Sequence, residues 1–349
     1  MGTSLIQIQS WLFTLCLLGI AQPAWATSSS TFTPNEKTSG APLLGTYLSV
    51  LEDTTDQLTL EQAIAARSQF IPITQDFPSL GFKRHTHWFH LQISGEFLRD
   101  EQYLLHVDYA FLDELSFFET QSGTLIQEIH TGDGLPFDSR PIDYETFLFP
   151  LELQPGQSTD IYFRVKSTES LLFPVQFFSR AEERRIVSRR NYIFGGLFGA
   201  IVLIVLYNLF LWLIIRDRSY LLYWLYLSIQ AIFQFIYSGY AFRYWWPNAP
   251  ELQVAGLVIG GLLMALLGLE FCREYMNTRS ILPRSDRALQ LAEGAIVITL
   301  LLALAVDLQL AMLAISFASF AVPIMILCVV FRLAFYEKSA AAIYVFLAF

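Results

Sequence analysis

The sequence has 349 residues and a formal net charge of −9; 54% of its residues are hydrophobic and 15% are charged. That charged share is well below the roughly 25% of ordinary soluble domains, which argues against a chain that is soluble throughout. Residues 27–179 hold 21 acidic and 8 basic residues (net −13), whereas residues 180–349 hold 10 acidic and 14 basic residues (net +4). The acidic first half would repel phosphates, which argues against nucleic acid as a partner.

Residues 1–26 have the pattern of a secretory signal peptide. The apolar stretch from Trp11 to Ile20 is too short to span a bilayer, and residues 24–26 (AWA) form an A-x-A cleavage site. The leader departs from the pattern because it has no Lys or Arg before the apolar stretch, so a retained anchor is the alternative. We predict cleavage after Ala26, followed by a loose Ser/Thr/Pro-rich linker over residues 27–42.

Residues 43–179 are predicted to form a strand-rich domain. Phe89, Leu91 and Ile93 alternate with polar or aromatic neighbours, which is the period-2 pattern of a strand, and the segments 103–108, 161–166 and 171–177 alternate similarly. Turn signals separate these strands at residues 122–123, 131–134 and 154–157. Seven or eight short strands in this length predict an all-β sandwich of jelly-roll type, with a face and loop rims that can hold a ligand.

One segment of this domain reads as a helix instead. Residues 58–67 begin with Thr59 as the expected N-cap and carry Gln62 at the capping-box position.

Four residues of the strand-rich domain are candidates for a sugar-binding surface. Trp88 would stack on a pyranose ring, Tyr109 would extend the aromatic face, and Asp108 and Asp113 would accept hydrogen bonds from hydroxyl groups. The alternative is that Trp88 packs beneath a loop and that Asp113 lies in a solvated turn.

All five histidines lie in the same half, at positions 85, 87, 90, 106 and 130. On a strand, His85 and His87 would point the same way and His90 the opposite way, so we expect solvated or loop histidines, with a metal site as the alternative.

The second half is predicted to be an all-α transmembrane bundle. Stretches of about 20 apolar residues can cross a bilayer. Five such spans are expected at 191–215, 219–239, 252–271, 288–306 and 308–331, and a sixth begins at residue 339. The sixth is still apolar at Phe349, so we expect the span and the chain to continue beyond that residue.

The distribution of Lys and Arg sets the predicted orientation. With the first half outside, the loops on the cytoplasmic side carry eight basic residues, whereas the outer loops between spans carry only Arg243. Five arginines over residues 180–190 lie on the outer side and oppose this bias. This basic juxtamembrane segment is expected either to lie against outer lipid headgroups or to relay motion from the sandwich to the bundle.

Polar residues within the predicted spans are Asn208, Gln230, Gln234 and Glu293. Asn208 and the two glutamines are expected to hydrogen-bond between helices, at about 0.6 kcal/mol each. Glu293 is expected to reach the membrane interface, and a proton relay is the alternative interpretation. Pro323 is expected to kink the fifth span.

Signatures of catalysis are missing from the sequence. It contains no G-x-x-x-x-G-K-[ST] loop, no H-E-x-x-H and no G-x-S-x-G motif. The glycine pairs 195–196 and 260–261 lie in spans and are expected to allow close helix packing. We therefore predict no catalytic residue, metal or cofactor for this chain.

Long segments resemble one family. LEDTTDQLTLEQAIA, HTHWFHLQI, LLHVDYAFLDELSFFE and IYFRVKSTESLLFPVQFF resemble the second type of extracellular sensor domain of the bacterial seven-transmembrane receptors with diverse intracellular signalling modules. LYNLFLWLIIRDRSYLLYWLYL and GYAFRYWWPNAPE resemble the start of their seven-helix region. The resemblance covers residues 43–349 and implies a periplasmic jelly-roll sensor over 43–179, a basic segment over 180–190 and a seven-helix relay over 191–349 in the inner membrane.

The resemblance also implies a cytoplasmic output module in the same polypeptide, commonly a GGDEF diguanylate cyclase, a histidine kinase or a phosphatase. The expected partners are the lipid bilayer and a small-molecule or carbohydrate ligand, and the sequence leaves open whether the chain forms a homodimer. A transporter or channel with a substrate-capturing outer domain is the alternative, although it would predict internal repeats and broken helices. An anchored carbohydrate-active enzyme would need a suitably spaced carboxylate pair.

Overall fold

The computed structural model describes residues 31–34, 41–83, 85–96, 102–168, 170–305 and 308–335, with no side chains described over 304–316. The expected signal peptide (1–26) and sixth span (from 339) lie outside these residues. The chain forms two compact units. The β unit is Ala24–Leu197 with Phe235–Val254, and the helical unit contains Phe198–Gln234 and Ala255–Phe349.

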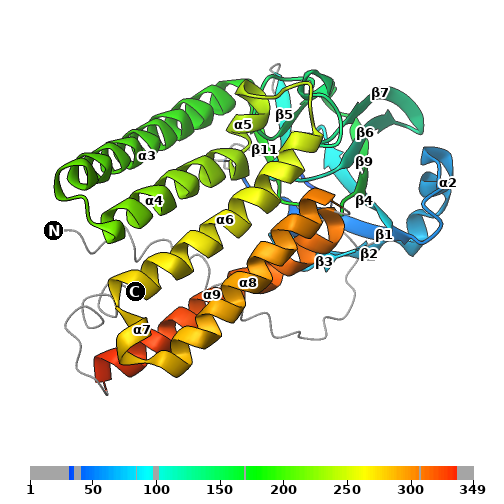
Figure 1. The fold of residues 1–349 in the computed structure, drawn as a ribbon. Helices are drawn as coiled ribbons and strands as arrows, with labels where there is room; N and C mark the ends of the chain where they lie inside the picture. Colours follow the sequence, from blue (N-terminus) through cyan, green and yellow to red (C-terminus); the bar gives the residue numbers. More distant parts are fainter. Residues whose placement is uncertain are drawn as a thin grey trace. The chain divides into compact units, whose positions relative to one another are not determined.

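The β unit is built on antiparallel sheets, as the period-2 pattern predicts (Figure 1). Its strands are β1 (Ser49–Asp53), β2 (Ile71–Pro72), β3 (Ser79–Phe82), β4 (Thr86–Ser94), β5 (Tyr103–Val107), β6 (Glu114–Gln121), β7 (Thr124–Thr131), β8 (Phe147–Leu151), β9 (Ser158–Lys166), β10 (Ser170–Leu172) and β11 (Val175–Ser179). A six-stranded sheet has the order β2-β1-β4-β9-β6-β7, a three-stranded sheet has the order β11-β5-β8, and β10 pairs with β3. The expected count of seven or eight strands was too low, because β2, β3 and β10 are too short to show an alternation.

The main core of the β unit joins residues from these sheets. Phe89, Leu91 and Ile93 of β4 are fully buried together with apolar residues of β5, β8 and β11. Across the core, Phe117 of β6 stacks on Phe149 of β8, with ring centroids 4.8 Å apart. This arrangement is a β-sandwich, as the sequence predicted.

Phe32 corrects the expectation that residues 27–42 are only a loose linker. Its backbone pairs with β4 and its ring is 3% exposed. The ring packs against Tyr47 and Phe177, both at 5.2 Å. Burial of this apolar ring stabilises the packing of this part of the segment against the β domain.

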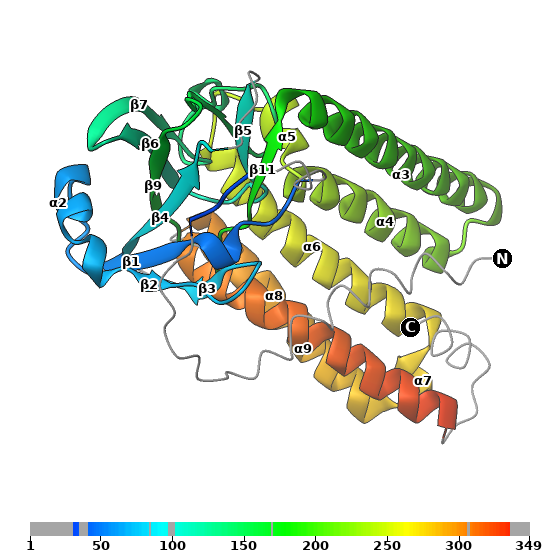
Figure 2. The same cartoon turned by 180° about the vertical axis from the view of Figure 1, so that it is seen from behind.

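The other face of the six-stranded sheet is also covered. Helix α2 (Leu60–Ala65) has the predicted capping box between Thr59 and Gln62, and it lies beside β1 (Figure 2). Ala63 and Phe70 pack there on Trp88, Phe118 and Tyr162. The alternating pattern therefore separates two buried faces, not a buried face from a solvated one.

The remaining helices are α3 (Arg180–Ile215), α4 (Arg218–Tyr237), α5 (Tyr240–Tyr244), α6 (Glu251–Tyr275), α7 (Thr278–Ile281), α8 (Pro283–Ala305) and α9 (Leu308–Phe335). Within the described residues, four helical segments are long and apolar enough to cross a membrane: α3, α4, α6 and Phe317–Phe335 of α9. The expected span 288–306 lies almost wholly in α8. The basic segment 180–190 is not a separate surface helix, because it forms the first turns of α3.

Only some of the glycines in the long helices lie at close helix contacts. A Cβ at Gly260 of α6 would lie 3.3 Å from the ring of Phe233 in α4, as expected for a helix contact. Gly195 and Gly196 were expected to act similarly, but no atom lies within 4 Å of a Cβ built there. Pro323 lies inside α9, whose helix continues on both sides of it.

Candidate functional site

The candidate site lies within the β unit, where the loop between β7 and β8 contacts α3 and α5. It is called the junction below and consists of Asp108, Arg140, Asp143, Tyr144, Glu145, Arg190 and Arg243. Two of these residues, Arg140 and Glu145, are charged and buried, which is costly unless they are paired. Their partners therefore define how the β domain holds the two helices.

Arg140 is the centre of the junction. The residue is 6% exposed, and its guanidinium lies over the rings of Phe137 and Phe147, at 4.5 and 4.6 Å from their centroids. It donates hydrogen bonds to the backbone carbonyls of Tyr144, at 2.9 Å, and Glu145, at 2.6 Å. Burial lowers the pKa of Arg140 to about 10, so the side chain stays cationic at neutral pH.

Tyr144 connects this loop to α3. Its hydroxyl accepts a hydrogen bond from Arg190 at 3.3 Å, and the Arg190 guanidinium also pairs with Asp108 at 2.9 Å. Burial raises the pKa of Tyr144 to about 12, which keeps the phenol neutral. Ile186 and Val187, one turn before Arg190, pack against the buried apolar cluster to which Tyr144 belongs.

Glu145, the next residue, connects the loop to α5. Its carboxylate is 1% exposed and receives Arg243 at 2.8 Å, and Asp143 pairs with the same guanidinium at 2.9 Å. A Cβ at Gly239, which precedes α5 with φ +82°, would lie 2.8 Å from the Glu145 carbonyl oxygen. Glycine therefore permits both the left-handed backbone and the close approach.

An aromatic contact also holds α5 against the β domain. The ring of Phe137 meets Phe242 edge to face with centroids 5.6 Å apart, and the Phe137 N–H donates to the Pro247 carbonyl at 2.8 Å. No local pattern in the sequence indicated these contacts, because they join positions about a hundred residues apart.

His106 lies behind the junction on β5. Its ring is 3% exposed and contacts the hydroxyl of Thr146 at 2.6 Å and the amide oxygen of Gln176 at 3.2 Å. Burial lowers the pKa of His106, although Asp108 at 3.6 Å opposes that shift. The expectation of solvated histidines was wrong for His87, His90 and His106, which are 2–3% exposed.

The structure does not assemble the sugar-binding surface predicted from the sequence. Trp88 is 1% exposed and stacks on Phe118 beneath α2, so neither ring face is open for a pyranose. Asp108 instead pairs with Arg190, and Asp113 accepts the Thr168 N–H at 2.7 Å. Tyr109 packs against the main core, on the other side of the six-stranded sheet from Trp88.

Two of the intramembrane polar residues, Asn208 and Glu293, differ from the prediction. Asn208 donates to the Ile204 carbonyl one turn earlier in α3, at 2.9 Å, so this bond lies within its helix. Gln230 and Gln234 are half-buried in α4. Glu293 does not stand alone at an interface, because Arg273 of α6 donates to its carboxylate.

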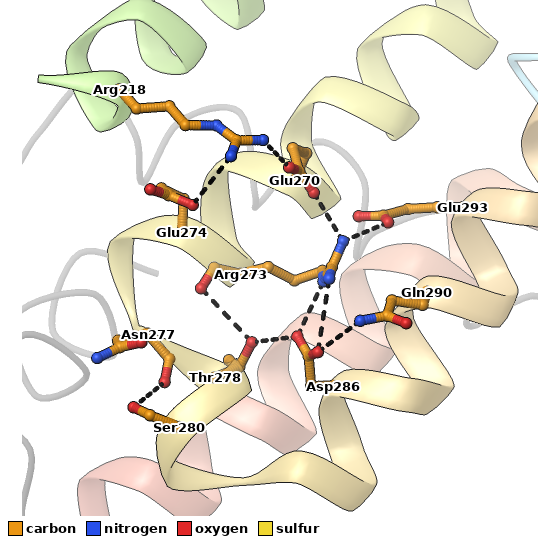
Figure 3. Close-up of polar contacts among 10 residues, drawn as sticks. All are labelled: Arg218, Glu270, Arg273, Glu274, Asn277, Thr278, Ser280, Asp286, Gln290 and Glu293. Atoms are coloured by element: carbon orange, nitrogen blue, oxygen red, sulfur yellow. Dashed lines mark hydrogen bonds and ion pairs between the residues drawn. The ribbon is translucent and has the colours of Figure 1, made fainter.

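Glu293 belongs to a charged cluster in the helical unit, called the Arg273 cluster (Figure 3). Arg273 pairs with Glu270 at 2.7 Å and with Asp286 at 2.9 Å. Glu270 also pairs with Arg218 of α4 at 2.6 Å, so the cluster connects α4, α6 and α8. Arg218 and Arg273 are among the eight basic residues that were predicted to lie in cytoplasmic loops. Their ion pairs were not predicted, although Asp286 and Glu293 are seven residues apart, on one face of a helix.

Asp286 is the most buried acid of the cluster, with a side chain 4% exposed. It also accepts hydrogen bonds from Thr278 at 2.8 Å and from Gln290 at 2.7 Å. Within the described residues, no group of three or more His, Cys, Asp or Glu side chains is arranged to hold a metal ion.

A β-sandwich whose loop holds the first turns of α3, a candidate membrane span, and the short helix α5 indicates a membrane protein that carries a β domain. Residues 45–179 match the family described as 7TMR-DISM extracellular 2, and residues 190–349 match 7TM diverse intracellular signalling. The chain therefore belongs to the seven-transmembrane receptors with diverse intracellular signalling modules. Its β domain is extracellular, and both matched domains are sensory and not catalytic. Among curated proteins, none matches the chain.

Proposed function

We propose that the chain senses a ligand on its extracellular β domain and transmits the binding event to the helix bundle through the junction. One observation carries the proposal: Arg140 fixes the backbone of two consecutive residues, Tyr144 and Glu145, whose side chains bind different helices. A shift of this loop would move its contacts to α3 and α5 together. A ligand that favours one position of the loop would then shift the population of helix arrangements.

The remaining parts of the proposal are supported by the family resemblance. The receptor is proposed to cross the bacterial inner membrane several times, after a cleaved signal peptide, with its β domain in the periplasm. A cytoplasmic output module in the same polypeptide, such as a diguanylate cyclase or a histidine kinase, would read the state of the bundle. Linkage is reciprocal. If ligand binding shifts the equilibrium between two states of the module by some factor, the affinity for the ligand must differ between those two states by the same factor.

A carbohydrate remains the proposed ligand class, because the domain is a β-sandwich rich in aromatic residues and carboxylates. The aromatic ring that stacks on the sugar cannot be that of Trp88, because α2 covers it. Binding of sugars to the full chain would therefore be measured with Trp88 intact, and its buried position predicts no direct role in that binding.

Hydrogen exchange on the full chain in lipid nanodiscs tests the relay without a known ligand. Glu145→Gln removes the charge that holds Arg243 and should change amide exchange across residues 270–293 by about threefold or more. Glu119→Gln is the matched control, because Glu119 is also a buried carboxylate but pairs with the backbone of Glu152 outside the junction. Unchanged exchange at 270–293 in Glu145→Gln, or an equal change in both variants, would overturn the relay.

A further inference from the structure

The first turns of α3 have two faces of different character. Glu183, Ile186, Val187 and Arg190 follow the spacing i, i+3, i+4, i+7, and each is at least half-buried. Ile186, Val187 and Arg190 contact the β domain as described above. One face of this basic segment is therefore used for the junction.

The opposite face carries three arginines. Arg184, Arg185 and Arg189 are exposed, together with Ser188 between them. No carboxylate pairs with any of the three within the described part of the chain, whereas Arg180 and Arg190 both have ion-pair partners. The β domain is strongly acidic, yet it leaves these three charges uncompensated.

This arginine face runs directly into the apolar surface of the span. Tyr192 and Ile193 follow it and are 80% and 56% exposed. A surface of that kind on a membrane helix faces lipid, and tyrosine favours the headgroup layer. Arg189 precedes Ile193 by four residues, or about 6 Å at 1.5 Å per residue.

These distances reach into the interfacial layer, which is the headgroup region of the membrane. It adds about 5 to 7 Å to each side of the hydrocarbon core. Arg189 therefore lies in or at the edge of the layer, and Arg185, one turn further out, lies within a Debye length of it. Guanidinium groups bind phosphate through two parallel hydrogen bonds, which suits phospholipid headgroups.

We propose that Arg184, Arg185 and Arg189 form a binding surface for the phosphate groups of anionic phospholipids in the outer leaflet. The surface explains why a basic segment stands on the side of the membrane where Lys and Arg are usually depleted. It also divides the segment by face: Arg190 contacts the β domain, whereas Arg184, Arg185 and Arg189 contact lipid. Lipid composition would then affect α3, the same helix that contacts the sensory β domain.

A fluorescence experiment on the full chain in nanodiscs tests this surface. Cys16, Cys272 and Cys328 are replaced by alanine, and a fluorophore is attached to a cysteine placed by Ser188→Cys. Headgroup-spin-labelled phosphatidylglycerol and phosphatidylcholine are then compared as quenchers at equal mole fractions. We expect phosphatidylglycerol to quench at least about threefold more efficiently, and added salt to weaken this preference.

Three variants make the result specific. The triple change R184Q/R185Q/R189Q should reduce the preference to that of a neutral surface, whereas R184K/R185K/R189K should keep most of it because the charge remains. The control R279Q/R284Q/R287Q removes three other exposed arginines and should leave it unchanged. Equal quenching by both lipids in the parent protein, or a preference that survives the triple glutamine change, would overturn the proposal. A preference that falls equally in the control would overturn it too, because it would reflect net charge alone.

Discussion

Glu145 and Arg243 are 98 residues apart in the sequence, yet a carboxylate oxygen of one lies 2.8 Å from a guanidinium nitrogen of the other. The glutamate belongs to the loop before β8, and the arginine belongs to the short helix between two membrane spans. Tyr144 makes the corresponding contact with Arg190 in α3. The β domain thus holds both helices with two adjacent residues of one loop.

Removing the charge of Glu145 is predicted to destabilise the protein. Glu145→Gln leaves the Arg243 guanidinium with Asp143 as its remaining acidic partner, and we expect a loss of about 1–3 kcal/mol. Thermal unfolding of the full chain in detergent measures this loss. Asp143→Asn is the comparison, because Asp143 is 73% exposed and its ion pair should contribute less than about 1 kcal/mol. A larger cost for Asp143→Asn than for Glu145→Gln would contradict the assignment.

The pH dependence of stability is predicted to contain a term from Glu119. Burial raises the pKa of this fully buried carboxyl to about 7. The folded state then binds the proton more tightly than the unfolded state, so stability falls as the pH rises from about 4.5 through 7, by up to about 3 kcal/mol. Glu119→Gln should remove this fall. Unfolding of both proteins at acidic and mildly alkaline pH provides the measurement, and an identical slope in both would refute the prediction.

His106 is predicted to act in the opposite direction. Burial lowers its pKa, so the neutral ring stabilises the folded state above the ordinary histidine pKa, and this contribution is lost as the pH falls below about 6.5. Asp108, Arg190 and Tyr144 are the titratable groups that face the ring. His106→Gln should flatten the acid limb of the stability profile. His87→Gln is the control for a buried histidine outside the junction, because burial also lowers the pKa of His87.

Nuclear magnetic resonance separates these two histidines. Protonation of His106 should shift the signals of the Arg190 side chain, because Asp108 lies between them, whereas protonation of His87 should not. An Arg190 signal that is constant through the titration of His106 would show that the ring and the ion pair are independent.

The sequence predicted the sandwich, the four candidate spans of the described residues and the capping box of α2, because periodicity and caps are local signals. Phe89, Leu91 and Ile93 lie in the core as their alternation indicated. The same alternation could not show that Trp88 is covered by α2, since an aromatic residue on the second face of a strand fits both an open and a buried surface. The junction was missed for a similar reason: Arg140 and Arg243 carry no local pattern, and their partners are set by tertiary contacts.

Trp88 is predicted to be a core residue and not a ligand contact. Trp88→Ala should cost about 3–5 kcal/mol, as for other buried aromatic residues. Trp88→Phe should cost much less, because its indole N–H has no partner within the described residues and the smaller ring can keep the stack with Phe118. Thermal unfolding gives the two costs, and sugar binding by Trp88→Phe is the second measurement. A stable Trp88→Phe protein that loses a sugar bound by the parent would contradict this assignment.

Arg273 is predicted to be the most sensitive position of the helical unit. Arg273→Gln leaves Glu270, Asp286 and Glu293 close together with only Arg218 and neutral donors nearby, and we expect a loss of about 2–4 kcal/mol. Arg273→Lys should recover only part of this loss, because a single ammonium cannot reproduce a guanidinium that reaches three carboxylates. Arg279→Gln, at an exposed arginine of α7, should change stability by less than about 0.5 kcal/mol.

The double variant Arg273→Gln with Asp286→Asn tests whether the cost comes from unpaired charge. If it does, the double variant should be more stable than Arg273→Gln alone, because one uncompensated carboxylate has been removed. Thermal unfolding in detergent at constant ionic strength compares the four proteins of this cycle. Strictly additive losses would mean that the two side chains act independently and that the cluster does not hold α6 and α8 together.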